Sequence, residues 1–180
     1  AIGDAVAGLP SGTVIVLADG VYTGPGNRDI DFAGKEMTIR SASKNPERCV
    51  IDCQGSEADP HRGFKLNSGE GRDSVVEGFT IRNGDVRGEY GPLASGGAIH
   101  CSDGSPRIAY NIITGNHCVM GAGGIAGHYS APQIINNIID GNTSDRNGGG
   151  IGYGGSLTGG GVPLVAGNVI SNNHAALDGG

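Results

Sequence analysis

A six-residue motif that begins and ends with asparagine occurs three times in the second half of the chain. The copies span residues 111–116, 137–142 and 168–173, so the first two start 26 residues apart and the last two 31 apart. Each copy closes a longer stretch that has proline in its second position. Recurrence at such a period predicts stacked structural units, because one unit is too short to form a core alone.

Aligning the copies places apolar β-branched residues in three columns. Such side chains favour strands over helices, so each copy is expected to contribute three short strands to one coil. Coils stacked about 4.8 Å apart would pair these strands in parallel and enclose one core. The columns are Ile99, Ile125 and Ile151; Ile108, Ile134 and Val165; and Ile113, Ile139 and Ile170.

The asparagines fall where the strands must turn a corner. Asparagine adopts left-handed backbone conformations more readily than most residues, and stacked side-chain amides can hydrogen-bond along the axis of a stack. We therefore predict a structural asparagine ladder made of Asn111, Asn137, Asn168, Asn116, Asn142 and Asn173.

These patterns predict an all-β fold, a right-handed parallel β-helix with three parallel sheets and coils of about 26 residues. Residues 1–180 are expected to form a single domain, which is either a whole protein or a fragment of a longer chain. Residues 1–12 would form a short N-terminal helical cap, with Ile2, Val6 and Leu9 on one side. Residues 13–95 would form irregular coils, and residues 96–180 the regular repeats.

Composition restricts the partners of such a helix. The formal net charge is −6, whereas a nucleic-acid-binding domain normally carries a basic stripe, so no nucleic-acid partner is expected. No apolar run is long enough to span a membrane, and no membrane span is expected. Aromatic residues make up only 4% of the chain. A core of stacked aliphatic side chains leaves little room for a cofactor, and we expect none.

The four cysteines, Cys49, Cys53, Cys101 and Cys118, leave two alternatives open. They are either buried free thiols or include one disulfide. Cys49 and Cys53 would lie about 13 Å apart on one strand, which is too far to bridge each other. A zinc site is not expected, because the chain has no Cys-x-x-Cys and its histidines lack ligand spacing.

Two further stretches carry a family resemblance, namely residues 17–23 (Leu-Ala-Asp-Gly-Val-Tyr-Thr) and 77–84 (Glu-Gly-Phe-Thr-Ile-Arg-Asn-Gly). With these stretches and its Asn-x-Ile-x-x-Asn turns, the chain resembles the secreted right-handed parallel β-helix repeat proteins of the pectate-lyase-like superfamily. The resemblance covers essentially the whole chain and implies an extracellular or cell-surface location. It also implies an alternative function as a polysaccharide lyase or other carbohydrate-active enzyme, which would use Ca²⁺ to neutralise a uronate.

The candidate parts of such a lyase are charged residues on or beside strands. No compact acidic cluster accompanies them, and the alternative interpretation is that they are solvated charges on outer strand faces. We therefore assign no catalytic, cofactor-binding or metal-ligating residue. The candidate parts are Arg40, Arg82, Arg107, Asp52 and Asp140.

Four excursions, at residues 56–63, 67–74, 84–96 and 152–162, interrupt the coils. Insertions in stacked repeats cluster on one face, which is often the binding face. The excursions would form either a glycan-binding rim or a hydrogen-bonded loop network that closes irregular coils. The candidate rim consists of His61, Arg62, Arg72, Arg87, Tyr90 and Tyr153.

The function favoured by the sequence is that of a structural module outside the cell or on its surface. The loops of such a module would contact polysaccharide. A β-helix without end caps also exposes strand edges, which can recruit further strands. The chain would in that case assemble with itself, head to tail, into a filament.

Overall fold

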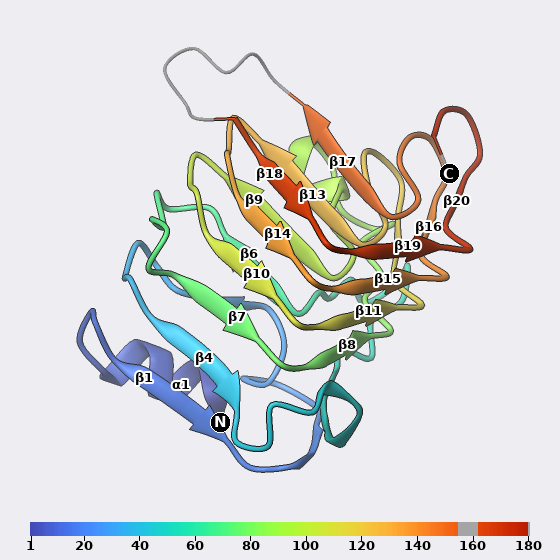
Figure 1. Cartoon of the computed structure of the whole chain (residues 1–180). Coiled ribbons are helices and arrows are strands. Elements are labelled where there is room, and N and C mark those ends of the chain that lie inside the picture. Colours follow the sequence, from blue (N-terminus) through green and yellow to red (C-terminus); the bar gives the residue numbers. More distant parts are fainter. Residues whose placement is uncertain (155–161, 180) are drawn as a thin grey trace.

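The computed structural model describes residues 1–154 and 162–179. Its strands form a right-handed parallel β-helix of about five turns, in which each coil stacks on the one before it (Figure 1). The N-terminus lies at the first coil, and the chain ends at the opposite end of the stack (Figure 1). The predicted fold class is therefore confirmed.

Two six-stranded sheets run the length of the stack. Sheet A consists of β1 (Val14–Leu17), β4 (Thr38–Ser41), β7 (Val75–Glu77), β10 (Arg107–Ala109), β14 (Gln133–Ile135) and β18 (Leu164–Ala166). Sheet B consists of β2 (Gly20–Tyr22), β5 (Cys49–Asp52), β8 (Thr80–Arg82), β11 (Ile112–Thr114), β15 (Ile138–Asp140) and β19 (Val169–Ser171).

The third side of the stack is a five-stranded sheet, and a short fourth sheet adds to the three expected from the sequence. Sheet C consists of β3 (Ile30–Asp31), β6 (Phe64–Leu66), β9 (Ile99–Ser102), β13 (Ile125–His128) and β17 (Ile151–Gly154). Sheet D consists of β12 (His117–Cys118), β16 (Thr143–Ser144) and β20 (His174–Ala175). Sheet D follows the second asparagine of each repeat and lies between sheets B and C along the chain.

The strand register confirms the three predicted columns. Ile99, Ile125 and Ile151 are successive partners in sheet C. The same holds for the column of Ile108 in sheet A and the column of Ile113 in sheet B. Stacking identical β-branched residues keeps each side chain over its equivalent, so that the column packs without gaps.

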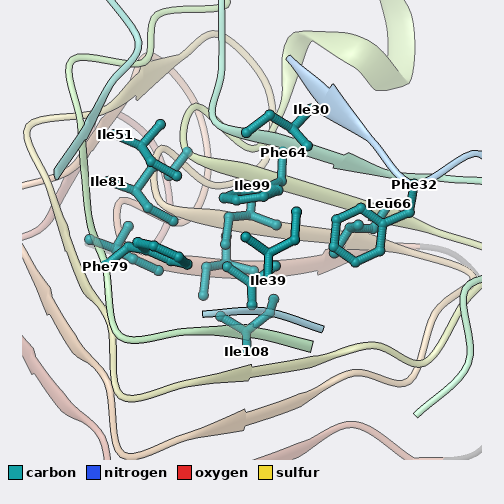
Figure 2. Close-up of a cluster of buried hydrophobic side chains, with 14 of the residues drawn as sticks. Ile30, Phe32, Ile39, Ile51, Phe64, Leu66, Phe79, Ile81, Ile99 and Ile108 are labelled. Atoms are coloured by element: carbon teal, nitrogen blue, oxygen red, sulfur yellow. The ribbon is translucent and has the colours of Figure 1, made fainter. Parts of the chain in front are cut away.

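The interior is filled by aliphatic and phenylalanine side chains that converge from sheets A, B and C (Figure 2). Ile30, Phe64 and Ile99 stack from three successive coils of sheet C (Figure 2). Phe32 and Phe64 meet edge to face, with their ring centroids 6.3 Å apart, a geometry that aromatic pairs favour. The irregular first coils therefore share one continuous core with the regular repeats.

A single α-helix, α1 (Ile2–Gly8), covers the N-terminal end of the stack and packs beside β3. Ile2 and Val6 are buried as the helical spacing predicts. Leu9 was expected on the same side, but that prediction is wrong. The chain is already extended at Leu9, and its side chain is 38% exposed.

Two short 3₁₀ helices, η1 (Pro46–Arg48) and η2 (Gly91–Ala94), lie in the connections between strands. η2 belongs to the predicted excursion at 84–96. The excursion expected at 152–162 begins as strand β17, and its residues 155–161 lie outside the described residues.

All four cysteines are free and buried, which decides between the two alternatives. Burial raises the pKa of Cys49 and of Cys118 to about 11, and it also raises the pKa of Cys53 and Cys101. Because the thiolate is the reactive form of cysteine, these residues are unreactive packing groups at neutral pH.

Candidate functional site

A polar groove follows the corner at which the coils pass from sheet B to sheet D. We call it the corner groove. Its volume is about 590 Å³, and its lining comes from four successive coils, so the groove runs along the axis of the β-helix. It is lined by Asp52, Gln54, Gly55, Asn83, Gly84, Asp85, Gly115, His117, Gly141 and Thr143.

The floor of the groove is built from left-handed turn residues. Asn83, Gly115 and Gly141 have φ of 56°, 63° and 65°, which turns the chain away from sheet B in three successive coils. Glycine adopts this conformation without strain, and asparagine tolerates it. Since two of the three residues have no side chain, the backbone itself lines the floor.

An asparagine ladder supports this floor from the inside. Asn142 Nδ2 donates to the Asn173 Oδ1 atom at 2.9 Å, and Asn116 Nδ2 donates to the Asn142 Oδ1 atom at 2.9 Å. The backbone N–H of Gly84 donates to Asn116 Oδ1 at 2.9 Å, which extends the ladder one coil further. The ladder fixes each corner relative to the next, so the groove is preorganised.

A second ladder lies at the corner between sheets A and B. Asn111 Nδ2 donates to Asn137 Oδ1 at 3.1 Å, and Asn137 Nδ2 donates to Asn168 Oδ1 at 3.0 Å. Asn111 and Asn137 are almost fully buried. The six asparagines singled out by the sequence therefore occupy two ladders, each at one corner of the stack.

The wall on the side of sheet B carries outward-facing polar side chains. Asp52 accepts hydrogen bonds from Arg82 Nε at 3.0 Å and from Asn83 Nδ2 at 2.9 Å. Asp140, which precedes the lining residue Gly141, accepts hydrogen bonds from Ser171 Oγ and Asn172 Nδ2, both at 2.7 Å. These two hydrogen bonds hold the pKa of Asp140 below its ordinary value, so this carboxylate stays ionised.

The opposite wall is formed by Asp85 and by the outward-facing residues of sheet D. Arg87 Nη2 donates to Asp85 Oδ2 at 2.7 Å. Burial raises the pKa of Asp85, but the hydrogen bonds from Arg87 outweigh burial, and the pKa lies below its ordinary value. His117 Nε2 lies 2.8 Å from Asp145 Oδ1. This wall thus carries the carboxylate of Asp85, the guanidinium group of Arg87 bonded to it, and the imidazole of His117.

Two of the predicted rim residues, His61 and Arg87, contact the groove-lining residue Asp85, although neither lines the groove itself. His61 pairs with Asp85 through an isolated β-bridge, and its Nδ1 lies 2.5 Å from Asp29 Oδ2. Arg87 also lies 3.5 Å from Glu57. Both side chains are therefore held by carboxylates close to the groove.

The other predicted rim residues do not join them. Arg62 is only 1% exposed, so it does not face the solvent as a rim residue would. Arg72 is exposed on the connection between β6 and β7, and Tyr90 is 90% exposed next to η2. The Tyr153 ring lies over Gly127, in register with the buried Cys101, but it stays 40% exposed on the end strand of sheet C. These four side chains do not form one surface.

Arg62 instead anchors the loop that contains η2. Its guanidinium group donates to the carbonyl oxygens of Leu93 and Ser95, each at 2.6 Å, and of Gly96 at 3.3 Å. The loop lies beside a second, less polar concavity of about 360 Å³, which also contacts Met120, Ala126 and His128. Arg62 is a structural residue, because its donors are used to hold loop carbonyls.

The candidate lyase residues are divided between two sheets. Arg40 and Arg107 lie on strands β4 and β10 of sheet A. Asp52, Arg82 and Asp140 lie on sheet B, in one row of register partners that also includes Thr114. Only this second group borders the corner groove.

Sequence reasoning did not identify the corner groove, although a signal was present. His117, Thr143 and His174 follow the second asparagine of each repeat and are register partners in sheet D. A polar residue at the same place in every copy, next to a turn, marks an outward-facing column. The asparagines and glycines next to this column form the turn. Because they are structural, the polar column beside them was not recognised as a candidate binding surface.

Fold and groove together define the class of protein as a parallel β-helix repeat protein with a polar groove along one corner. The family model described as "Protein of unknown function (DUF1565)" matches residues 1–179. The chain therefore belongs to the DUF1565 family, and its resemblance to right-handed parallel β-helix repeat proteins is confirmed. Comparisons with curated proteins and with solved structures find no match.

Residues 1–154 and 162–179 lack two further features. No group of three or more histidine, cysteine, aspartate or glutamate side chains is arranged to hold a metal ion within these ranges. In the same part of the chain, no helix has the length and apolar character needed to cross a membrane.

Proposed function

We propose that this chain is a rigid structural module that contacts glycans through the corner groove. The observation that carries the proposal is a polar groove that crosses four successive coils with hydrogen-bonding groups on both walls. At a coil spacing of about 4.8 Å, four coils span about 14 Å, which suits several units of a linear ligand. A glycan chain offers hydroxyl groups at regular intervals to such walls.

The scaffold supports binding by rigid, preformed contacts. The groove floor is fixed by the ladder of Asn116, Asn142 and Asn173, and its walls belong to paired strands. Sites on such elements hold their side chains in place, which lowers the entropic cost of binding. Polysaccharides are displayed outside cells, so the proposal places the module outside the cell or on its surface.

Replacing Thr143 with Tyr is expected to abolish glycan binding by filling the groove. Thr143 lies on β16 with its side chain toward the groove and is only partly exposed. Binding would be measured by affinity electrophoresis and by calorimetry, with soluble polysaccharides that are neutral, acidic or amino-substituted. The parent chain should bind at least one of them, and Thr143→Tyr should bind about tenfold or more weakly, a change of about 1.4 kcal/mol.

The matched control is Gln133→Tyr. Gln133 is an outward-facing, partly exposed residue of the same coil, but it lies on sheet A. This variant should bind as the parent chain does. Equal weakening by both variants, or no binding of any glycan by the parent chain, would refute the groove as a glycan site.

A second candidate function is end-to-end association, and the last coil favours it. Val165 and Ile170 are 45% and 50% exposed, whereas Ile134 and Ile139, their partners one coil earlier, are fully buried. Sheets A and B also have terminal strands at both ends of the stack within the described residues. Pairing β18 and β19 with β1 and β2 of a second copy would continue both sheets and cover this apolar surface, and it requires α1, which covers the N-terminal end through Ile2 and Val6, to move aside.

Under this candidate function, Ile170→Asp is expected to prevent association, because a carboxylate would be buried in the new contact. The mass of the parent chain should rise with concentration in sedimentation velocity experiments, while the variant stays monomeric. Val169→Asp serves as control, since Val169 is exposed on the same strand but alternates to the outer face. A parent chain that is monomeric at all concentrations would exclude head-to-tail assembly.

A further inference from the structure

The corner groove contains features that indicate the charge of its ligand, an inference that rests on the proposed function. No aromatic side chain is among the described residues that line the groove. Stacking on sugar rings, a common source of affinity for glycans, is therefore not available there. Affinity must come from hydrogen bonds and charge.

Carboxylates outnumber guanidinium groups in and beside the groove. Asp52 and Asp85 line it, and Asp140 and Asp145 border it. Arg82 and Arg87 are the arginines bonded to the two lining carboxylates. With histidine neutral, these six groups carry a net charge of −2, which has the same sign as the −6 of the whole chain.

The two arginines cannot readily turn toward an anionic ligand. Arg82 Nε lies 3.0 Å from Asp52, and Arg87 contacts both oxygens of Asp85, at 2.7 to 3.1 Å. Releasing either arginine would leave a largely buried carboxylate without its partner, which is costly. Both oxygens of Asp85 are occupied by Arg87, but the other carboxylates keep acceptor positions that are suited to ammonium donors.

We propose that the corner groove selects cationic amino-sugar polymers over neutral and uronate-containing glycans. The protonated amino groups of such a polymer would donate charge-assisted hydrogen bonds to Asp52, Asp140 and Asp145, while its hydroxyl groups bond to Thr143 and the groove floor. Uronates would meet the same carboxylates as like charges. Hydrogen bonds from Arg87 hold the pKa of Asp85 below its ordinary value, and those from Ser171 and Asn172 do the same for Asp140, so both groups are carboxylates at neutral pH.

The test compares three hexasaccharides of equal length by calorimetry at low and high salt, with glucosamine, N-acetylglucosamine or galacturonate as the repeating unit. The glucosamine form is expected to bind about tenfold more tightly than the N-acetylated form, since each partly exposed ion pair contributes up to about fivefold. Its affinity should also fall as salt rises, because salt screens exposed charges.

Asp140→Asn combined with Asp145→Asn tests the location of the effect, because the partly exposed Asp140 precedes the lining residue Gly141 and the exposed Asp145 bonds the lining residue His117. This double variant should lose most of the preference for the glucosamine form. The control is Asp73→Asn with Asp103→Asn, which changes the net charge equally at exposed residues next to sheets A and C. Melting temperatures of both variants would verify folding.

The outcomes separate the two proposals. Equal binding of the glucosamine and N-acetylated forms, blocked by Thr143→Tyr, would overturn the charge selectivity but support the glycan groove. Tighter binding of galacturonate would also overturn the selectivity. Equal loss of preference in the control variant would assign the effect to overall charge and thus contradict a local site. Absence of binding to all three hexasaccharides and to the wider glycan set would refute both proposals.

Discussion

Replacing Asn142 with Leu is expected to lower the free energy of unfolding by about 3–5 kcal/mol, although the two side chains are similar in size. Asn142 is fully buried and stands in the middle of its ladder. Its Oδ1 accepts from the backbone N–H and from Nδ2 of Asn116, and its Nδ2 donates to the carbonyl oxygens of Ile113 and Asp140 and to Asn173.

Leucine cannot replace any of these hydrogen bonds. The backbone N–H of Asn116 and the carbonyl oxygen of Ile113 would lose a buried partner, and each such loss costs about 1–3 kcal/mol. The change would be measured by urea unfolding followed by circular dichroism. Because the ladder supports the floor of the corner groove, glycan affinity should fall in the same variant.

Asn147→Leu provides the matched control. Asn147 is an exposed asparagine of the same coil, so its replacement should change stability by less than about 0.5 kcal/mol. If Asn142→Leu were no more destabilising than this control, the ladder would not be a source of stability. If the ladder does stabilise the protein, the double variant Asn116→Leu/Asn142→Leu should lose less free energy of unfolding than the two single variants together, since the two residues share hydrogen bonds.

The sequence was sufficient to predict the fold because the repeat places the same residue types at the same depth in every coil. Ile113, Ile139 and Ile170 are register partners as aligned, since a one-residue slip would turn the whole column outward. The place of the asparagines at the corners was equally predictable, because a buried corner needs a side chain that satisfies the backbone. The expected left-handed conformation, however, belongs to the residue before each ladder asparagine, such as Gly141 before Asn142.

The candidate site could be predicted only in part. His117 and Thr143 occupy equivalent places in two repeats and line the groove, whereas its lining from earlier coils and the predicted rim depend on side chains that no repeat brings into line. Arg62 illustrates the difficulty. It follows His61 in a polar stretch and resembles a surface residue, yet its guanidinium group is needed by three carbonyl groups of a loop more than thirty residues later. Likewise, Arg87 contacts not only Asp85, two residues away, but also Glu57 in the excursion at 56–63.

Replacing Gly84 with Ala is expected to destabilise the protein by about 3–4 kcal/mol, although only a methyl group is added. A Cβ atom at this position would overlap the carbonyl oxygen of Gly97 and lie 2.8 Å from its carbonyl carbon. Neither neighbour is a flexible side chain, so relief requires a backbone shift. The backbone N–H and carbonyl groups of Gly84 bond to Asn116 and His117, and a shift would weaken both bonds.

The Gly84→Ala variant would be compared with Gly8→Ala by urea unfolding and by hydrogen exchange. Gly8 has no atom near the position of an added Cβ and closes the α1 helix, so alanine there should be neutral or stabilising by up to about 1 kcal/mol. In Gly84→Ala, faster exchange should be concentrated in sheet D and in the corner next to it. A loss of protection spread evenly over sheets A, B and C would instead show that this corner is no weaker than the rest of the stack. Because Gly84 also lines the corner groove, a folded Gly84→Ala variant with unchanged glycan affinity would contradict the role of the groove floor in binding.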